Sequence, residues 1–298
     1  MKVEPSALSL KGCKMYTKRS PLLLAFCAVV TVAVASTNAT AGTKVTLGRT
    51  VPSGQRVSMD QIDHSAWDAL LRKYVDGSGR VDYVGWKRSP RDNAALDGYL
   101  LGLSRGDMRR RTSREAHLAF WINAYNAVTM KGILREYPTS SIRNHTAKLY
   151  GYNIWHDLLL VVGDSKISLN DIEHNVLRKT GEPRIHFAIV CASRSCPRLL
   201  NEAYTVQKLE QQLMTNTQNF FAIPENFSYR NGTFYLSSIL KWFAEDFGST
   251  QTARLRAISP YLPDRTSKQA AANGTGRISY LGYDWRLNDQ ATPRTARR

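Results

Sequence analysis

The segment from Ser113 to Tyr137 constrains the fold most, because its apolar residues recur at helical spacing along its length. These residues form a broad apolar face, and Pro138 stops the pattern directly afterwards. The spacing therefore predicts one long helix with a wide surface to bury.

Two asparagines lie within this predicted helix, in the sequence FWINAYNAV. Asn123 and Asn126 are three residues apart, so their side chains occupy neighbouring positions on one face, flanked by aromatic residues. Two interpretations stay open. The amides orient a substrate carbonyl or a catalytic imidazole, or they make helix-to-helix hydrogen bonds inside the core.

A secretory leader is predicted at the N-terminus. Residues 22–35 form an apolar run that follows Lys18 and Arg19 and precedes a small-x-small sequence at 39–41. The run is shorter than the roughly 20 residues that a membrane span needs, and no later stretch of comparable length lacks charges. We expect residues 1–41 to be removed, and the mature chain to be periplasmic or secreted without a transmembrane segment.

Two further features of the leader bear on its processing. A start at Met15 leaves a compact basic segment before the apolar run, so Met15 is the expected true start. Lipid anchoring at Cys27 is disfavoured, because Phe26 precedes it instead of a small residue.

The exported chain is expected to be basic. Removing the leader takes away five basic residues and one acidic residue, which lowers the formal charge from +17 to +13. For an exported protein this charge favours anionic envelope lipids or cell-wall polymers as partners over specific nucleic-acid binding. The alternative is an ordinary solvated surface. The most concentrated basic patch consists of Arg105, Arg109, Arg110, Arg111 and Arg114.

The pattern along the chain predicts a single α+β domain, with a central, mostly antiparallel sheet packed against several helices. Residues 42–58 lack periodicity and are expected to be a flexible lead-in. The domain is expected to span 59–288, and residues 289–298 to be a disordered basic tail. In its C-terminal half we expect a helix over 205–221, a hairpin that turns at Asn231-Gly232, helices over 238–247 and 252–258, and a strand over 277–281.

A buried acid is expected just after a hairpin. The sequence LLLVVGDSKISL predicts the hairpin, and Ser168 with Asp171 resembles a capping box that starts a helix. Glu173 falls inside the apolar stripe of that helix, so its carboxylate should need a cationic or hydrogen-bonding partner. His174 falls on the polar flank.

The stretch RIHFAIVCASRSCP carries the chemistry-bearing residues of the mature chain. Residues 185–190 are branched and aromatic, which predicts a central strand. Side chains alternate along a strand, so His186 and Cys191 should lie on opposite faces. Cys196, on the returning loop, is then the thiol able to reach the imidazole.

Four readings of Cys191 and Cys196 remain open. They form a disulfide, which an oxidising compartment favours. Cys196 is a nucleophile with His186 as base and an acid behind the imidazole. The two sulfurs and a histidine hold zinc, although the spacing is atypical. Or they are two inert buried thiols.

Several segments together resemble the domain of unknown function 547 (DUF547) family over roughly residues 60–288. They are AFWINAYNAV, SLNDIEHNVLR, PRIHFAIVCASRSCPRLLNEAYT and ISYLGYDWRLN. The resemblance implies an exported bacterial protein and brings no assigned activity. The residues that match the family pattern are Asn123, Tyr125, Asn126, Glu173, His174, His186, Cys191, Cys196 and Asn201.

The preferred functional hypothesis is a thiol-dependent hydrolase or acyltransferase that acts on an amide or ester. In it Cys196 attacks a carbonyl, His186 moves the proton and Glu173 holds the imidazole, while Asn123 or Asn126 supports the oxyanion. The rival is a noncatalytic envelope-associated domain with the two cysteines bonded, Glu173 neutralising a buried arginine, and the basic patch docking on anionic material. Neither a cofactor nor a metal is predicted, because the sequence contains no cofactor fingerprint.

Overall fold

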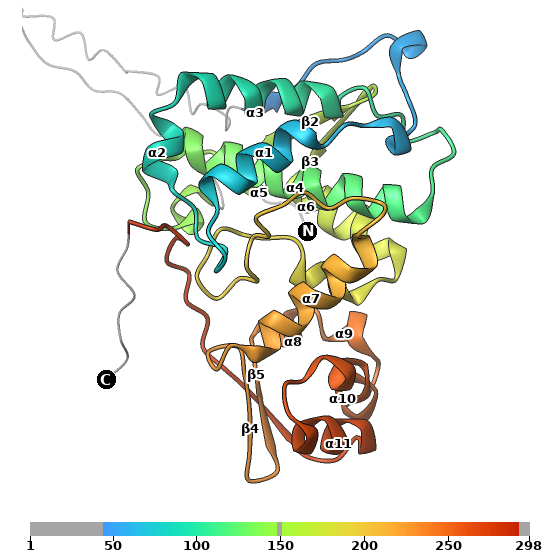
Figure 1. Ribbon diagram of the computed structural model, residues 1–298, viewed down its shortest axis with the longest axis vertical. Helices are drawn as coiled ribbons and strands as arrows, with labels where there is room; N and C mark the ends of the chain where they lie inside the picture. Colours follow the sequence, from blue (N-terminus) through green and yellow to red (C-terminus); the bar gives the residue numbers. More distant parts are fainter. Residues whose placement is uncertain (1–43, 148–150, 292–298) are drawn as a thin grey trace, which may run out of the picture. The chain divides into compact units, whose positions relative to one another are not determined.

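The computed structural model describes residues 44–147 and 151–291, and all of them fall in one compact unit (Figure 1). The predicted leader over 1–41, with Met15 and Cys27, lies outside the described residues, as does the chain beyond residue 291. Among the described residues, no helix combines the length and the apolar character that a membrane crossing requires.

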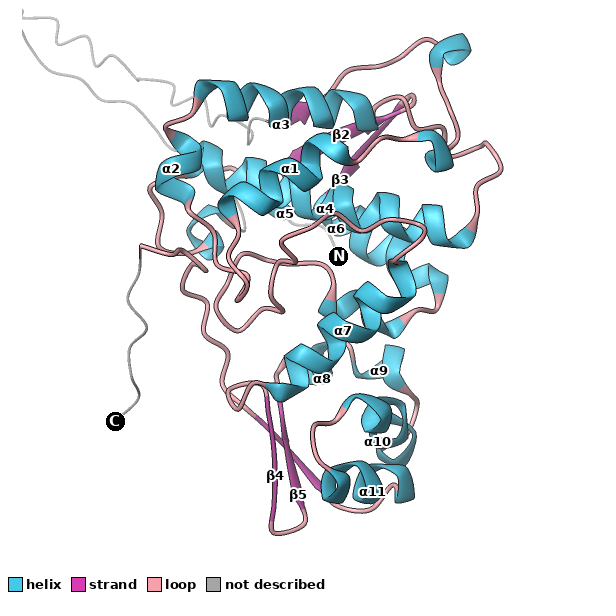
Figure 2. Ribbon diagram, viewed as in Figure 1, coloured by secondary structure: helices cyan, strands magenta, loops and turns pink. Residues whose placement is uncertain are grey.

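Helices dominate the described chain, and the strands are short and few beside them (Figure 2). The α-helices are α1 (Ser65–Tyr74), α2 (Tyr83–Lys87), α3 (Pro90–Leu103), α4 (Arg114–Glu136), α5 (Ile154–Asp157), α6 (Leu169–Asp171), α7 (Leu209–Ala222), α8 (Ile239–Trp242), α9 (Ala244–Phe247), α10 (Gln251–Ile258) and α11 (Arg265–Asn273). A π-helix, Ile172–Leu177, follows α6, and short 3-10 helices cover Ser53–Gln55, Met59–Gln61, Ile142–His145, Arg178–Thr180, Pro183–Phe187 and Ser259–Tyr261.

The strands form two small mixed sheets. In the first, β1 (Val45–Leu47) pairs parallel to β2 (Leu158–Val162), which forms an antiparallel hairpin with β3 (Ser165–Ser168). In the second, β4 (Phe227–Arg230) and β5 (Thr233–Leu236) form an antiparallel hairpin, and β6 (Arg277–Tyr280) pairs parallel to β5. The α+β class is confirmed, but neither sheet is central or large, so the expectation of a central sheet is wrong.

Helix α4 takes the central position that was expected of a sheet. It begins after Ser113, whose hydroxyl accepts a hydrogen bond from the Ala116 N–H, and it ends just before Pro138. Of its 23 residues, 17 are buried, so the helix is covered on nearly every side instead of along one stripe. Neighbouring helices and the first sheet therefore pack around α4.

Two hydrophobic clusters build the core, and α7 joins them. Leu209 and Leu213 of α7 belong to the cluster around α4, whereas Phe220 and Phe221 belong to a second cluster with the β4–β6 sheet and α8–α11. After β6 the chain runs back from the second cluster to the first (Figure 1). There Leu287 forms an isolated antiparallel β-bridge with Ser193. The returning segment thus borders the cysteine loop.

The predicted strand over 185–190 does not form. The backbone N–H and carbonyl groups of this segment make hydrogen bonds with partners other than a neighbouring strand. Residues Pro183–Phe187 form a 3-10 helix, and the segment after it begins with a turn and is buried. The side-chain amide of Asn126 donates to the Ala188 carbonyl and accepts from the Val190 N–H, at 3.0 and 2.9 Å. The Asn216 amide donates to the Phe187 carbonyl at 2.6 Å. These amides replace the hydrogen bonds of a sheet ladder.

The predicted ends of the domain also need correction. Strand β1 lies within the segment that was expected to be a flexible lead-in and pairs with β2. At the other end, Asp289 is buried and accepts a hydrogen bond from the Tyr137 hydroxyl at 2.7 Å. The ordered chain therefore extends beyond 59–288 at both ends. Helix α7 begins at Leu209, later than the predicted 205, and 238–247 is divided between α8 and α9.

Gly79 is expected to tolerate no side chain. Its φ is +80°, and a Cβ there would lie 2.6 Å from the Arg198 Cα and 2.7 Å from the Leu199 N, directly behind the cysteine loop. Gly79→Ala should destabilise the fold by roughly 2–5 kcal/mol, from left-handed strain and overpacking together. Gly77→Ala, in the same turn with nothing within 4 Å, is the control and should change the urea midpoint little. Equal midpoints for the two variants would contradict this account.

Candidate active site

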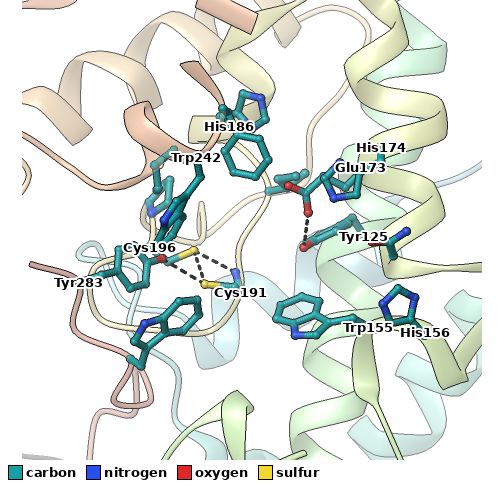
Figure 3. Close-up of a pocket in the computed structure, with 16 residues that line it drawn as sticks. Tyr125, Trp155, His156, Glu173, His174, His186, Cys191, Cys196, Trp242 and Tyr283 are labelled. Atoms are coloured by element: carbon teal, nitrogen blue, oxygen red, sulfur yellow. Dashed lines mark hydrogen bonds between the residues drawn. The ribbon is translucent and has the colours of Figure 1, made fainter. Parts of the chain in front are cut away.

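A pocket of about 250 Å³ lies where α4, the π-helix, the cysteine loop and the returning C-terminal segment meet (Figure 3). Aromatic side chains form much of its wall, and its polar groups include three histidines, one glutamate and two cysteines, which are chemically reactive types. The lining residues are Tyr125, Trp155, His156, Asn170, Glu173, His174, His186, Ile189, Cys191, Cys196, Pro197, Ile239, Trp242, Phe243, Tyr283 and Trp285.

Both cysteines line this pocket as free thiols, with their sulfurs 3.0 Å apart. The Cys191 sulfur also lies 3.0 Å from the Ser193 hydroxyl and 3.3 Å from the Tyr283 hydroxyl. The Cys196 sulfur accepts the Cys191 backbone N–H at 2.9 Å. The Tyr283 side chain also forms a hydrogen bond with Cys196, so the two sulfurs share this partner.

The two thiols differ in acidity. Hydrogen bonding to the Cys196 side chain, with further hydrogen bonds to Ser193 and Tyr283, lowers the pKa of Cys191 and outweighs its burial. Burial, reinforced by the neighbouring Cys191, raises the pKa of Cys196 well above its ordinary value. These shifts favour the thiolate at Cys191 over the thiolate at Cys196, and the thiolate is the reactive form of cysteine.

The loop that carries the cysteines is tightly constrained. Ala192, which is fully buried, has a φ of +56°, an unusual conformation for a residue with a side chain and one that costs about 1–3 kcal/mol. The Cys196 N–H donates to the Ser193 carbonyl and closes the turn. Backbone hydrogen bonds from residues 194 and 195 to residues 286 and 284 fix the loop to the returning segment. Strain of this kind concentrates at functional sites.

Glu173 comes from the π-helix, an irregular helix type that is frequent at functional sites. Its carboxylate accepts the Tyr125 hydroxyl at 3.1 Å. Arg178 acts on this carboxyl only through space, and it lowers the pKa less than the Tyr125 hydrogen bond does. Burial raises the pKa of Glu173 to about 7, against the opposing effect of the Tyr125 hydrogen bond. A carboxyl group with this pKa exchanges its proton near neutral pH.

The predicted contact between Glu173 and His186 does not form. The His186 Nε2 lies 2.7 Å from Asp246 of α9, and its ring stacks on Phe243 with centroids 4.0 Å apart. Figure 3 shows the His186 ring well separated from the two sulfurs. Burial lowers the pKa of His186 to about 4, even though Asp246 acts in the opposite direction, so the ring is neutral at pH 7.

Asp246 is itself held by Arg178, which donates two hydrogen bonds to it at 2.6 and 2.8 Å. Burial acts to raise the pKa of Asp246, but the hydrogen bonds from Arg178 and His186 hold it below its ordinary value. Arg178 also lies 3.1 Å from the His174 Nδ1. The four side chains form a charged network that ties the second hydrophobic cluster to the pocket.

Asn123 and Asn126 do not line the pocket. The Asn123 amide donates to the Tyr204 carbonyl at 2.7 Å and accepts the Tyr204 N–H at 3.0 Å. Asn126 holds Ala188 and Val190 in the same two-bond manner. Both side chains are almost completely buried, so neither is placed to support an oxyanion. The amides do make hydrogen bonds inside the core, but their partners are backbone groups outside helices and not, as the alternative expected, another helix.

Removing the Asn126 amide should destabilise the protein strongly. Asn126→Ala leaves a buried N–H and a buried carbonyl without partners, at a cost of roughly 2–5 kcal/mol. Urea unfolding measures the loss, and Thr129→Ala on the same helix is a control that removes a buried hydroxyl with no hydrogen-bonding partner. A stable Asn126→Ala protein with normal unfolding but lost activity would instead support the oxyanion role.

Sequence reasoning missed several members of the site. Tyr283 and Ser193 contact the Cys191 sulfur, and Asp246 contacts His186. The sequence did indicate Asp246, because it is an acidic residue set among apolar residues in WFAEDF, as Glu173 is in its own helix. Tyr283 and Trp285 lie in the YDWRLN sequence that was noted only as part of the family pattern.

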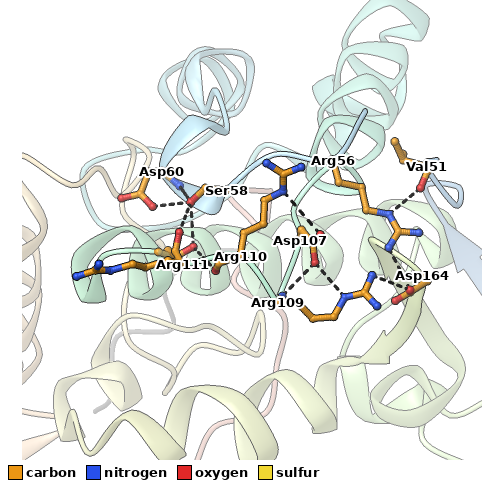
Figure 4. Close-up of polar contacts among 10 residues, drawn as sticks. Val51, Arg56, Ser58, Asp60, Asp107, Arg109, Arg110, Arg111 and Asp164 are labelled. Atoms are coloured by element: carbon orange, nitrogen blue, oxygen red, sulfur yellow. Dashed lines mark hydrogen bonds and ion pairs between the residues drawn. The ribbon is translucent and has the colours of Figure 1, made fainter. Parts of the chain in front are cut away.

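Three of the five arginines in the predicted basic patch are paired with carboxylates. Arg109 lies 3.1 Å from Asp164, Arg110 is 3.8 Å from Asp107, and Arg114 is 3.4 Å from Glu182 (Figure 4 shows the first two). Such pairs reduce the positive charge available for an anionic partner. Arg105 and Arg111 are also exposed.

The zinc reading finds no geometric support in the described part of the chain. Over residues 44–147 and 151–291, no group of three or more histidine, cysteine, aspartate or glutamate side chains is arranged to hold a metal ion.

Comparison with known families gives one match. The family described as "Protein of unknown function, DUF547" matches residues 109–221, a shorter part of the chain than the expected 60–288. The matched part contains Tyr125, Glu173, His186 and both cysteines. The residues of the site that follow it are Trp242, Phe243, Asp246, Tyr283 and Trp285. Neither the curated proteins nor the solved structures gave a match.

Proposed function

Through residues 109–221 this chain belongs to the DUF547 family, whose description assigns no activity, and we propose from the site itself that it is a thiol-dependent hydrolase or acyltransferase. One observation carries the proposal. The Cys191 sulfur, surrounded by hydrogen-bonding groups that favour its thiolate, lines an apolar pocket together with a carboxyl group whose pKa is about 7. The substrate class is an ester or an amide.

In the first half of the reaction, the Cys191 thiolate attacks the carbonyl carbon of the substrate. Glu173, which is partly protonated at neutral pH, donates its proton to the leaving oxygen or nitrogen. The carbon–heteroatom bond breaks, and the acyl group remains on Cys191 as a thioester. The nucleophile is thus Cys191, where the sequence favoured Cys196, because the pKa shifts favour the thiolate at Cys191.

In the second half, the Glu173 carboxylate takes a proton from water or from an acceptor alcohol or amine. That nucleophile attacks the thioester carbonyl, and Cys191 leaves as the thiolate. Water gives hydrolysis and any other acceptor gives acyl transfer. Glu173 therefore acts first as acid and then as base, which a pKa near 7 suits because both forms are populated at neutral pH.

His186 and Asp246 serve as positioning residues in this scheme. Their contact fixes Phe243, which forms part of the pocket wall, against the His186 ring. Trp242, Tyr283 and Trp285 complete the wall, with ring centroids 4.6–5.6 Å apart. An apolar wall of this kind excludes water and strengthens electrostatic interactions at the reacting carbonyl.

An acylation experiment tests the proposal. Protein kept in a reducing buffer is mixed with p-nitrophenyl acetate and p-nitrophenyl butyrate, quenched in acid, and digested for peptide mass spectrometry. We expect an acyl thioester on Cys191, formed with a burst of nitrophenol. Acylation confined to surface lysines, or equal labelling in a Cys191→Ser protein, would contradict the proposal.

One observation favours a second candidate function. The short distance between the two sulfurs suits a bond between them, and a bonded pair fits a noncatalytic envelope-associated domain. In that case the exposed Arg105 and Arg111 would contribute to binding anionic lipid or wall polymer. Cosedimentation with anionic vesicles, compared with neutral vesicles, measures this binding, and an inert, quantitatively bonded cysteine pair would have to accompany it.

Export is part of the proposal under either function, and it rests on the leader-like residues 1–41. We expect the mature chain to be recovered from the periplasm or the medium without these residues. N-terminal sequencing of fractionated protein tests this. An intact N-terminus in the cytoplasmic fraction would contradict it.

A further inference from the structure

Acyl transfer does not explain why two sulfurs lie side by side in the pocket. Acyl transfer needs one thiol, yet Cys191 and Cys196 both line the pocket, with their sulfurs 3.0 Å apart. A disulfide bond is about 2.05 Å long, so a shift of about 1 Å suffices to form it. The closed turn and the backbone bonds to the returning segment hold the second sulfur next to the first.

We propose that Cys191 and Cys196 form a two-electron redox couple that carries out thiol–disulfide exchange with a small disulfide entering the pocket. This is a second activity of the same cysteines, and it does not depend on acyl transfer. The substrate class is a low-molecular-weight disulfide or its dithiol or monothiol product, because the reacting sulfur lies inside a pocket of about 250 Å³.

The two sulfurs differ as the two members of such a couple must. An attacking thiol has to ionise readily, while the resolving thiol has to remain a thiol until the mixed disulfide has formed. Cys191 is the attacking member, because the Ser193 hydroxyl lies 3.0 Å from its sulfur in addition to Tyr283. Cys196, whose sulfur receives the Cys191 amide and shares Tyr283 but has no hydrogen bond with the Ser193 hydroxyl, is the resolving member.

The exchange balances in two steps. The Cys191 thiolate attacks one sulfur of a substrate R–S–S–R, which breaks the substrate bond, forms a Cys191–S–S–R mixed disulfide and releases one thiolate. Cys196 then loses its proton, and its thiolate attacks the Cys191 sulfur and releases the second R–S⁻. Both released thiolates take up protons. Two electrons pass from the cysteine pair to the substrate, which becomes two thiols, and the pair becomes a disulfide.

In this scheme Glu173 accepts the proton of Cys196. It lines the same pocket as both sulfurs, and its pKa of about 7 lets the carboxylate take up a proton near neutral pH. When the thiolate leaves, the same carboxyl group returns the proton. Loss of this group should therefore slow the second step and leave the first step unchanged.

The couple also links the two activities. An oxidised pair has no thiolate, so it cannot attack a carbonyl. The redox state of the surroundings would then determine how much of the protein is competent for acyl transfer.

A redox titration tests the proposal with the wild-type protein. Reduced protein is equilibrated in buffers of reduced and oxidised glutathione, quenched in acid, alkylated and weighed by mass spectrometry. We expect the fully oxidised form to lack two hydrogen atoms and to carry no glutathione, with a two-electron dependence on the glutathione ratio. Two free thiols throughout the titration, or a stable glutathione adduct on the wild-type protein, would overturn the proposal.

Two serine variants identify the roles. Cys196→Ser should accumulate a glutathione adduct on Cys191, because the resolving thiol is missing. In Cys191→Ser, an adduct on Cys196 should form at least about 10-fold more slowly at pH 7. Equal rates would overturn the assignment of roles. The ester assay reads acyl transfer separately, so failure of one activity leaves the result for the other intact.

Discussion

Cys191→Ser is expected to lower ester turnover by at least about 1,000-fold, because it removes the nucleophile that carries the acyl group. A serine hydroxyl at this position has no adjacent base in hydrogen-bonding contact to activate it, since Ser193, Tyr283 and Cys196 surround the sulfur. Steady-state hydrolysis of p-nitrophenyl butyrate in a reducing buffer measures the effect.

Cys196→Ser is the matched control for this substitution. It keeps a hydroxyl that can donate to the Cys191 thiolate, so turnover should fall by no more than roughly 10-fold, which is the most that weakening one hydrogen bond would cost. Loss of all activity in Cys196→Ser with normal activity in Cys191→Ser would restore Cys196 as the nucleophile and refute the present assignment.

Glu173→Gln is expected to make the protein more stable above neutral pH and less active. The pKa of Glu173 is about 7 in the folded protein, against 4.5 without the fold. Between these values the folded protein keeps a proton that the unfolded chain has lost, so wild-type stability falls as the pH rises and levels off above about 7. The glutamine has no charge to bury, so at pH 8 it should stabilise the protein by up to about 3 kcal/mol.

Urea unfolding of both proteins between pH 4 and 8 measures this difference. The two curves should agree near pH 4 and separate as the pH rises. Glu182→Gln is the control, and its effect on the free energy of unfolding should have the opposite sign. Arg184 binds the buried Glu182 carboxylate at 2.7 Å, so loss of this carboxylate should destabilise the protein at neutral pH. A constant difference between wild type and Glu173→Gln at every pH would contradict the buried, titrating carboxyl. Turnover of Glu173→Gln should fall by about 100-fold or more.

Local patterns predicted the local elements well. The long helix appeared as α4 with its Ser113 cap, the two hairpins formed as β2–β3 and β4–β5, and Ser168 with Asp171 makes the expected capping box. Each of these depends on residues close together in the sequence, where spacing and turn chemistry determine the outcome.

The segment over 185–190 shows why the central architecture was not predictable in the same way. Its branched residues indicated a strand, but the N–H groups of Ala188 and Ile189 donate to the Ile185 carbonyl. Three further backbone groups bond to the amides of Asn126 and Asn216, from helices α4 and α7. These amide partners are 62, 64 and 29 residues away in the sequence, and no periodicity reports them. Because His186 lies in a 3-10 helix, the alternation of side chains along a strand does not determine which way His186 and Cys191 point.

The sequence predicted which residues form the candidate site better than it predicted the contacts between them. Glu173, His186, Cys191 and Cys196 do line one pocket, as a site built from them requires. Their pairings depend on Tyr125 and Asp246, which approach from distant elements, so the expected order of thiol, imidazole and acid could not be derived from spacing.

The most direct test is the pH dependence of alkylation at each cysteine. Reduced wild-type protein is exposed briefly to iodoacetamide at a series of pH values, and each modified peptide is quantified by mass spectrometry. We predict that Cys191 reacts with a midpoint well below the ordinary thiol value of about 8.5, while Cys196 remains nearly unmodified in the folded protein. Ordinary midpoints for both thiols, or faster modification of Cys196, would contradict a Cys191 thiolate as the reactive group of this pocket.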